Sequence, residues 1–420
     1  MGKHFSFIHC ADLHLGEPFG GLYSGDTGPW TEAIHKATFK AFENVVTAAL
    51  TYRADAILIS GDVYNSDHHS LAAQMAFARE LYRAAQAGVQ IFIIHGNHDP
   101  DEAWRDVPLP PSVYVFSSDK VESVPLLVGG ETAAMVYGIS YKNRHMRENL
   151  ALRFRKKDED TFSIGMLHTE LGVAGSPYAP CTVDDLRNTK MDYWALGHVH
   201  ARKTPSMRPY MVYPGNTQGL DRSESGEKGC YLVDVGAYGT VTLKFIVTDA
   251  IRWMDMEVDI SSFQNPEELV REVVKQRATL REKTGKPNIV RLILRGQGVL
   301  QKAVSTPEGQ AYILQLLNDK EKFHHIFCYF AEIQDETKPF LNLEERRKIP
   351  DVMGSYLRTF DEINGLSSEK RLAVLKKEIA DRPEMAKFSR LMNMVSDDMI
   401  IRAFEKAEIK GAEMLAEDEG

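Results

Sequence analysis

Five short apolar segments of this chain each end directly at a motif rich in aspartate, histidine, asparagine and glycine. The motifs are ADLHLG at 11–16, SGD at 60–62, HGNHD at 95–99, LHTE at 167–170 and LGHVH at 196–200. Apolar runs of this length between turn residues are typical of buried strands. In an α/β sheet the carboxyl ends of neighbouring strands share one crevice, so the motifs converge there although they are far apart in sequence. The chain is therefore restricted to folds that bring these strand ends together.

Two amphipathic segments separate the first three strands. Residues 31–54 and 74–88 carry apolar side chains at helical spacing, which gives a βαβαβ order and predicts a layered α/β core. The later strand candidates lack long crossover helices, so we expect more antiparallel pairing among them. They are residues 132–140, 162–168, 193–198, 229–235 and 239–247.

The composition changes near residues 248–252, which marks a domain boundary. Beyond it the pattern reads strand 252–260, helix 266–283, strand 288–296, helix 309–320 and strand 324–333, and from about residue 341 it reads as helices only. We therefore predict three regions. They are a first domain at 1–248, a small α+β capping domain at 249–340 and a helical C-terminal region at 341–420.

Composition excludes several classes of protein. A hydrophobic content of 43% and a charged content of 26% are those of a folded soluble protein. The net charge of −9 argues against indiscriminate coating of nucleic acid but leaves room for a local basic groove. No apolar run reaches the roughly 18 residues of a membrane span, so we expect no membrane association. The four cysteines are far apart, as in a reduced cytoplasmic protein.

The converging polar side chains have the chemistry of metal ligands. They are Asp12, His14, Asp62, Asn97, His168, His198 and His200. A lone GD or DxH is usually a turn or a cap, and a lone GHxH is compatible with a hydrogen-bonded histidine pair. Independent turns have no reason to supply matching ligands at five strand ends, so we predict a metal site. Mixed oxygen and imidazole ligands suit Mn²⁺, Fe or Zn²⁺ better than Mg²⁺ or Ca²⁺ alone, and of the three we expect Mn²⁺. Seven ligands suit two divalent ions that share a bridging carboxylate.

The order of these motifs resembles that of the calcineurin-like metallophosphoesterase superfamily over roughly residues 5–235. The fuller strings, together with YPGN at 213–216, are similar to the branch that contains the SbcD-type DNA repair exonuclease subunit. The resemblance implies an α/β fold with a four-layer α/β/β/α sandwich. It also implies one ion at Asp12, His14, Asp62 and His200, and a second ion at Asp62, Asn97, His168 and His198.

The resemblance gives His98 a catalytic role. In the family the histidine of GNHD is not a ligand but lies near the leaving-group oxygen, as an acid or as a stabiliser of the transition state. An acidic residue or histidine often orients it from the position that Asn65 occupies here, so Asn65 is expected to orient His98 with less electrostatic support, or His68 or His69 to replace it. Ser66 stands where phosphoprotein phosphatases have arginine, which makes a phosphoprotein substrate less favoured.

Basic residues flank the motifs and suggest a phosphate-bearing substrate. Residues 141–157 include Arg144 and six further Lys or Arg residues, and Arg202 follows the GHVH motif. We expect Arg144 and Arg202 to bind substrate, with DNA as the partner. The alternative is a solvated helix, because acidic residues interleave with the basic ones.

The C-terminal region carries an apolar stripe formed by Phe388, Leu391, Val395, Met399 and Phe404, which either packs within the chain or docks a partner. The resemblance implies an SbcC-type, SMC-like coiled-coil ATPase as partner, and a homodimer. The favoured reading is a metal-dependent phosphodiesterase acting on DNA, the nuclease subunit of a double-strand-break repair complex. The alternatives are a small-molecule phosphodiesterase or nucleotidase, and a non-catalytic scaffold that binds DNA or an ATPase.

Overall fold

The computed structural model describes residues 2–22, 30–65, 70–101, 108–157, 161–319, 321, 324–338, 343–382 and 395–418. The chain divides into two compact units. One comprises Met1–Met256, Gln276–Arg291 and Leu317–Glu332, and the other comprises Glu257–Lys275, Leu292–Leu316 and Ile333–Gly420. No helix among the described residues is both long enough and apolar enough to cross a membrane.

The first sheet has six strands in the order β12-β11-β1-β2-β3-β4. They are β1 (Phe5–Cys10), β2 (Ala56–Ser60), β3 (Gln90–Ile94), β4 (Val113–Val115), β11 (Gly229–Val235) and β12 (Val241–Val247). Strands β1 to β4 pair in parallel, whereas β11 is antiparallel to both β1 and β12. Helix α1 (Trp30–Tyr52) connects β1 to β2, and α2 (Leu71–Gln86) connects β2 to β3, which confirms the predicted βαβαβ order.

The second sheet has the order β5-β6-β7-β8-β10-β9. Its strands are β5 (Glu122–Val128), β6 (Glu131–Gly138), β7 (Phe162–His168), β8 (Tyr193–Gly197), β9 (Lys203–Met207) and β10 (Tyr210–Tyr213). Here the expectation of antiparallel pairing is wrong for β6, β7 and β8, which pair in parallel. Their crossovers consist of loops with two short helices, η3 (Leu150–Arg153) and α3 (Val183–Asn188). Such crossovers leave no long periodic pattern in the sequence from which parallel pairing could be predicted.

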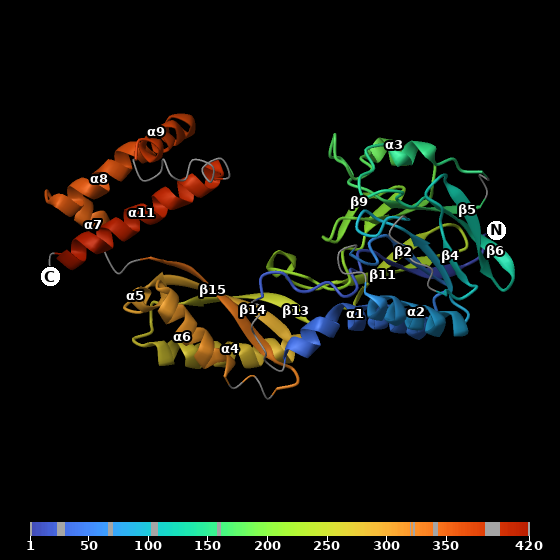
Figure 1. Cartoon of the computed structure of the whole chain (residues 1–420), viewed down its shortest axis with the longest axis horizontal. Coiled ribbons are helices and arrows are strands. Elements are labelled where there is room, and N and C mark those ends of the chain that lie inside the picture. Colours follow the sequence, from blue (N-terminus) through green and yellow to red (C-terminus); the bar gives the residue numbers. More distant parts are fainter. Residues whose placement is uncertain are drawn as a thin grey trace. The chain divides into compact units, whose positions relative to one another are not determined.

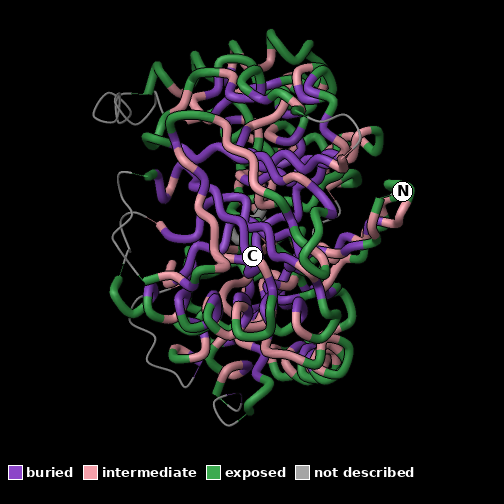
Figure 2. Tube along the Cα trace, turned by 90° about the vertical axis from the view of Figure 1, so that its right-hand side faces the viewer, coloured by how far each residue is buried: buried purple, intermediate pink, exposed green. Residues whose placement is uncertain are grey.

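Three apolar layers hold these elements together. Phe42 of α1 and Phe77 of α2 pack on the first sheet, and the two sheets face each other through residues such as Phe7 and Ile164. Trp194 and neighbouring residues pack beneath α3 and η3 on the far face of the second sheet. Figure 1 shows α1 and α2 on one side of the sheets and α3 on the other, and Figure 2 shows the buried interior in purple. The predicted four-layer α/β/β/α sandwich is therefore confirmed.

A third sheet follows, with the order β13-β14-β15. Its elements are β13 (Arg252–Asp259), α4 (Pro266–Thr284), β14 (Asn288–Gln297), α5 (Gln301–Val304), α6 (Pro307–Asn318) and β15 (Cys328–Lys338). They follow the strand–helix–strand–helix–strand order predicted from the sequence. An apolar cluster packs the start of α1, through Trp30, against Trp253, Ile289 and Phe327 at the beginnings of the three strands.

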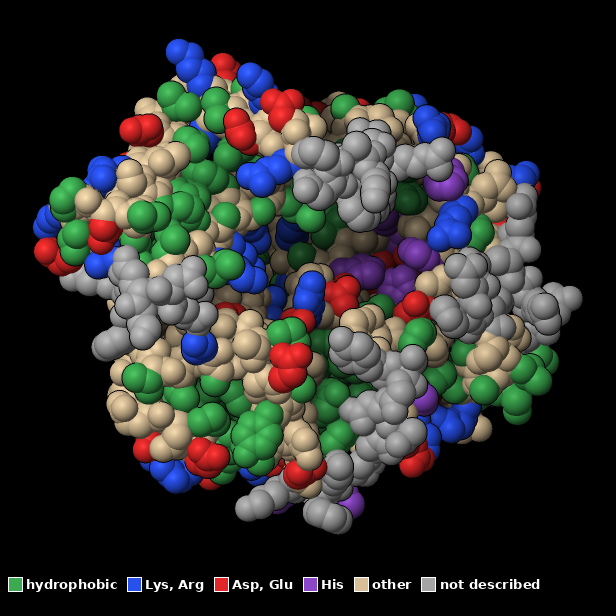
Figure 3. Space-filling model, turned by 60° about the vertical axis from the view of Figure 1, so that its left-hand side comes forward, with side chains coloured by type: hydrophobic (Ala, Val, Ile, Leu, Met, Phe, Trp, Pro, Cys, Tyr) green, Lys and Arg blue, Asp and Glu red, His purple; other side chains and the backbone are tan. Residues whose placement is uncertain are grey.

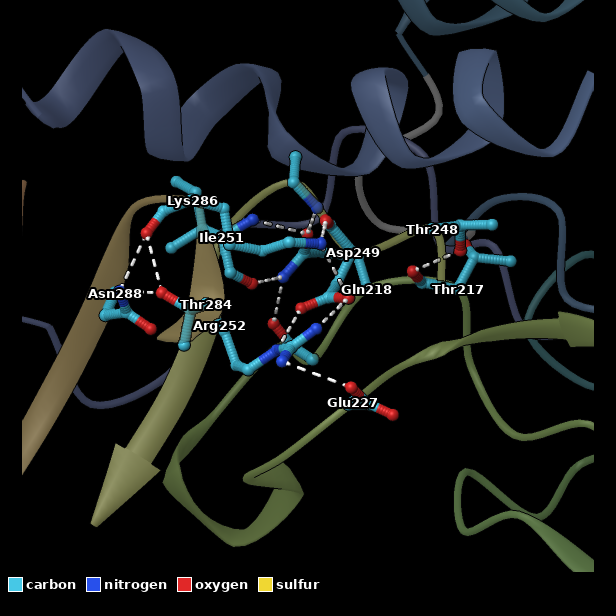
Figure 4. Close-up of polar contacts among 12 residues, drawn as sticks. Thr217, Gln218, Glu227, Thr248, Asp249, Ile251, Arg252, Thr284, Lys286 and Asn288 are labelled. Atoms are coloured by element: carbon cyan, nitrogen blue, oxygen red, sulfur yellow. Dashed lines mark hydrogen bonds and ion pairs between the residues drawn. The ribbon is translucent and has the colours of Figure 1, made fainter. Parts of the chain in front are cut away.

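A buried polar network lies where β12 passes into β13 (Figure 4). The fully buried Asp249 carboxylate accepts from Arg252 Nε at 2.8 Å and from Lys286 Nζ at 3.1 Å. The side chain of Gln218 pairs with the backbone of Ile251, accepting at 3.2 Å and donating at 2.6 Å. Buried charges are stable only when paired, so this network fixes the course of the chain between the sheets.

The described part of residues 343–418 contains helices only, as predicted. They are α7 (Leu343–Arg347), α8 (Val352–Asn364), α9 (Ser368–Ala380) and α11 (Asp397–Asp418). Of the predicted apolar stripe, the Phe404 ring stacks on Phe360 at 4.6 Å between ring centroids, whereas Met399 is 55% exposed. Phe388 and Leu391 lie outside the described residues.

Candidate metal centre

Backbone strain marks the strand ends that carry the polar motifs. Asp12, His14, Asp62 and His198 all have positive φ angles, of 52°, 42°, 52° and 100°. Non-glycine residues rarely adopt this conformation, and its cost of about 1–3 kcal/mol per residue persists only where the surroundings impose it. Strain at four of the seven predicted ligands is therefore typical of a functional site.

The glycines of these motifs allow the backbone segments to approach one another. A Cβ on Gly96 would lie 2.2 Å from Asp62 Oδ1, and one on Gly197 would lie 1.9 Å from the Ser60 carbonyl oxygen. Gly61 has a φ of +92°, and a Cβ there would lie 2.5 Å from His168 Nδ1. Any side chain at these three positions would therefore push the ligand-bearing loops apart.

The first ligand cluster joins the ends of β1 and β8. Asp12, His14 and His200 each offer an atom within 4.8 Å of the others. The Nε2 atoms of His14 and His200 face each other at 3.1 Å, and His14 Nε2 lies 3.9 Å from Asp62 Oδ2. The Asp12 carboxylate also accepts from the backbone N–H of His198, at 3.0 Å to Oδ1.

The second cluster comprises Asp62, His168 and His198, again with atoms within 4.8 Å. Asn97 belongs to it as well, because its Oδ1 lies 2.9 Å from His168 Nε2 and 3.0 Å from His198 Nδ1. His168 Nε2 is 3.3 Å from Asp62 Oδ2. The structure thus brings all seven predicted ligands together, with Asp62 next to histidines of both clusters.

The donor set fits divalent cations. His168 Nδ1 donates to the Ser60 carbonyl oxygen at 2.9 Å, so its Nε2 lone pair faces the oxygens of Asn97 and Asp62. Acceptors that face one another need a cation or a proton between them. Burial opposes protonation of His168, but Asp62 outweighs it and raises the pKa of His168 to about 9. Burial raises the pKa of Asp12 to about 6.

Two carboxylates that sequence reasoning did not assign support the ligands. Asp99, the last residue of the HGNHD motif, accepts from the backbone N–H groups of Asp62, Val63 and Gly96 at 3.1, 2.9 and 2.8 Å. It therefore ties two ligand-bearing loops together. The one sign of this role in the sequence is that Asp99 belongs to the HGNHD motif.

Glu224, at the end of η4 (Arg222–Glu224), is the second of these carboxylates. Its Oε1 accepts from His200 Nδ1 at 2.5 Å. Burial opposes the effect, but this hydrogen bond raises the pKa of His200 and lowers the pKa of Glu224 to about 2. No pattern in the sequence pointed to Glu224, because it lies 24 residues from its partner in an irregular loop.

His98 lies beside the centre without entering either cluster. Its backbone N–H donates to Asp62 Oδ1 at 2.8 Å, and its ring centroid is 5.2 Å from that of His14. Burial lowers the pKa of His98, and Arg144 lowers it further. His98 Nδ1 and Asn65 Oδ1 are both buried without a hydrogen-bond partner, so the expected hydrogen bond between these atoms is not formed in this structure. Ser66, His68 and His69 lie outside the described residues.

Some basic side chains of the segment at 141–157 are held by acidic partners. Arg153 is held by Glu148 through two hydrogen bonds of 2.7 and 2.5 Å, and Lys156 pairs with Asp192 at 2.9 Å. Arg144 is exposed and close enough to His98 to act on its charge. The guanidinium of Arg202 lies over the Phe245 ring, 3.9 Å from its centroid. Histidine side chains gather in a hollow of the surface, shown in Figure 3.

Comparison with known proteins agrees with this geometry. The family model of calcineurin-like phosphoesterases matches residues 5–202. The uncharacterized metallophosphoesterase YhaO of Bacillus subtilis is 36% identical over 82% of this chain and 84% of that protein. The DNA double-strand break repair protein Mre11 of Sulfurisphaera tokodaii is 25% identical over 92% of this chain and 96% of that protein, and Mre11 of Aeropyrum pernix is 28% identical over 70% and 74%. The chain therefore belongs to the calcineurin-like metallophosphoesterases and is a phosphoester hydrolase.

Proposed function

We propose that this chain is a metal-dependent phosphodiesterase that acts on DNA, as the nuclease subunit of a double-strand-break repair complex. The observation that carries the proposal is the pair of adjacent ligand clusters with His98 at their edge. The similarity to proteins named for DNA double-strand break repair, which extends over 92% of this chain for one of them, supports DNA as the substrate.

In this proposal the two clusters hold two divalent ions, Mn²⁺ by preference, which would activate water and offset charge on the phosphate oxygens. The protein's own groups do the remaining work. His98 gives a proton to the leaving oxygen, and its backbone hydrogen bond to Asp62 fixes the ring beside the centre. Arg144 and Arg202 bind neighbouring phosphates of the strand.

The test is a nuclease assay on linear duplex DNA with Mn²⁺, run beside bis-(p-nitrophenyl) phosphate and its monoester, each with and without chelator. Cleavage of DNA and of the diester, abolished by chelator and by Asp62→Asn, is the expected result. Turnover of the monoester alone would favour a nucleotidase instead. DNA binding without any hydrolysis would favour a scaffold.

Partner contacts are proposed on two apolar surfaces. On α2, the exposed side chains Leu71, Met75 and Tyr82 form a stripe suited to a second copy of the chain. In the C-terminal region a groove of about 530 Å³ between α9 and α11 is lined by apolar residues including Leu375, Met399 and Phe404. We propose that this groove docks the coiled-coil base of an SbcC-type ATPase.

We also propose that the chain acts in the cytoplasm and that its parts divide the work. The nuclease domain at 1–248 would hold the centre, and the helical region at 341–420 would hold the ATPase. Co-purification of the native protein, followed by nuclease assays with and without the associated subunit, tests this assignment.

A further inference from the structure

We infer that Glu224 is a positioning residue that sets the tautomer of the metal ligand His200, with Asn216 as the group that keeps it in place. The inference rests on the metal centre of the proposed function but not on its substrate. Glu224 Oε1 accepts from His200 Nδ1 at 2.5 Å, while the opposite ring nitrogen, Nε2, faces His14 Nε2 at 3.1 Å. The proton is therefore held on the side away from the cluster, and the Nε2 lone pair is free to bind an ion.

The second carboxylate oxygen of Glu224 prevents the side chain from turning. Oε2 accepts from Asn216 Nδ2 and from the Leu220 backbone N–H, both at 2.7 Å. The orientation of the Asn216 amide is itself fixed, because Nδ2 also donates to the Gln218 carbonyl oxygen at 2.7 Å. Asn216 is the last residue of the YPGN motif and is buried, which gives this part of the motif a role.

The loop around Glu224 is anchored at both sides. Arg222 binds Glu332 of β15 at 2.7 Å, and the Gly226 N–H donates to the Trp253 carbonyl oxygen of β13 at 2.9 Å. Glu224 thus reaches His200 from a loop that is tied to the third sheet. The other imidazole ligand with a comparable support is His168, whose Nδ1 is held by a backbone carbonyl oxygen instead of a side chain.

Because both carboxylate oxygens of Glu224 are hydrogen-bonded, Glu224→Gln tests the tautomer of His200 more directly than Glu224→Ala. The two N–H groups at the Oε2 position donate and need an acceptor oxygen there, so the NH₂ group of the glutamine must face His200 Nδ1. His200 Nδ1 then has to accept, which moves the ring proton to Nε2 and removes the ligand lone pair. Glu224→Ala leaves the tautomer free, because water can take the place of the carboxylate. If Glu224 served only the folding of the loop, Glu224→Ala would weaken metal binding more than Glu224→Gln.

The experiment is calorimetric titration of the metal-free full chain with Mn²⁺ at neutral pH, for wild type, E224Q, E224A and the control E227Q. Glu227 lies three residues further along the same loop and is 51% exposed. We expect two sites in wild type and E227Q, one of them weakened by about tenfold or more in E224Q, and a smaller loss in E224A. Nitrogen-15 spectra of histidine-labelled, metal-free protein should show the His200 proton on Nδ1 in wild type and on Nε2 in E224Q, with His200→Gln for assignment.

Three results overturn the inference. Unchanged affinities for both ions in E224Q overturn the role of Glu224 alone, as does a greater loss in E224A than in E224Q. A wild-type chain that binds no Mn²⁺ overturns the metal centre and this inference with it.

Discussion

The Nε2 atoms of His14 and His200 lie 3.1 Å apart, although 186 residues separate them in the sequence. His14 follows β1 of the first sheet, and His200 follows β8 of the second. The metal centre therefore lies where the two sheets of the sandwich meet, and each sheet supplies ligands to both clusters. Its integrity depends on the packing between the sheets as well as on the ligands.

A single variant that removes a ligand of one cluster should lose only the ion of that cluster. We expect His14→Ala and His168→Ala each to retain about one divalent ion per chain, because the other cluster keeps its own ligands. Asp62→Asn should lose both ions, since Asp62 lies beside histidines of both clusters. Elemental analysis after reconstitution measures the content, with the exposed His4→Ala as control. Two ions retained in all three variants would contradict the assignment.

His98→Gln should leave the metal content unchanged and reduce turnover by about 10²- to 10⁴-fold, because the leaving oxygen then lacks its acid. His98 contacts the centre through its backbone N–H, which the substitution preserves. Steady-state rates on a diester, measured beside elemental analysis, check this. Equal metal content with an undiminished rate would refute the role.

Asn65→Asp should move the alkaline limb of the pH–rate profile to higher pH by about 1 unit or more. Burial lowers the pKa of His98, and a carboxylate nearby would favour the imidazolium and raise that pKa again. The acid form would then persist to higher pH. An unmoved profile would show that Asn65 does not act on His98.

Arg144→Ala should weaken DNA binding and reduce the slope of log K against log salt concentration by about 1, as expected for one lost phosphate contact. Arg202→Ala is expected to act in the same way, since a guanidinium stacked on Phe245 keeps its N–H edge free. Arg153→Ala is the matched control, because Glu148 holds that guanidinium. Equal slopes in wild type and Arg144→Ala would remove the phosphate contact.

Asp249→Ala should lower the free energy of unfolding by about 3–5 kcal/mol, because it leaves the buried Arg252 without its carboxylate. Asp255→Ala removes a bidentate pair with Arg291 that is more exposed, and about 0–1 kcal/mol is expected there. Denaturant unfolding of both variants checks the difference. Equal losses would mean that burial of the Asp249 pair contributes nothing.

The ligand set could be predicted from the sequence because each ligand follows a strand that its own apolar residues make recognisable. Asp62 and His168 could be placed at strand ends from a few neighbouring residues, and the sheet edge then brings them together. The parallel pairing of β6, β7 and β8 could not be read in this way. Their crossovers are loops, and loop geometry depends on tertiary contacts that leave no periodic pattern.

The supporting groups were harder to predict than the ligands for the same reason. Glu224 contacts His200 only because an irregular loop folds back on the centre, and charged residues in such loops are common without a function. The basic segment at 141–157 shows that a run of Lys and Arg residues in the sequence does not reveal which of them are held in ion pairs. The basic residues of 141–157 suggested contact with phosphate, but Glu148 pairs with Arg153 and Asp192 pairs with Lys156, as the interleaved acidic residues allowed.

The most direct test of the metal centre is the divalent metal content of the purified chain after chelation and reconstitution with Mn²⁺. We expect about two ions per chain, bound within the clusters of Asp12, His14 and His200 and of Asp62, His168 and His198. A chain that retains no ion, while remaining folded, would contradict it.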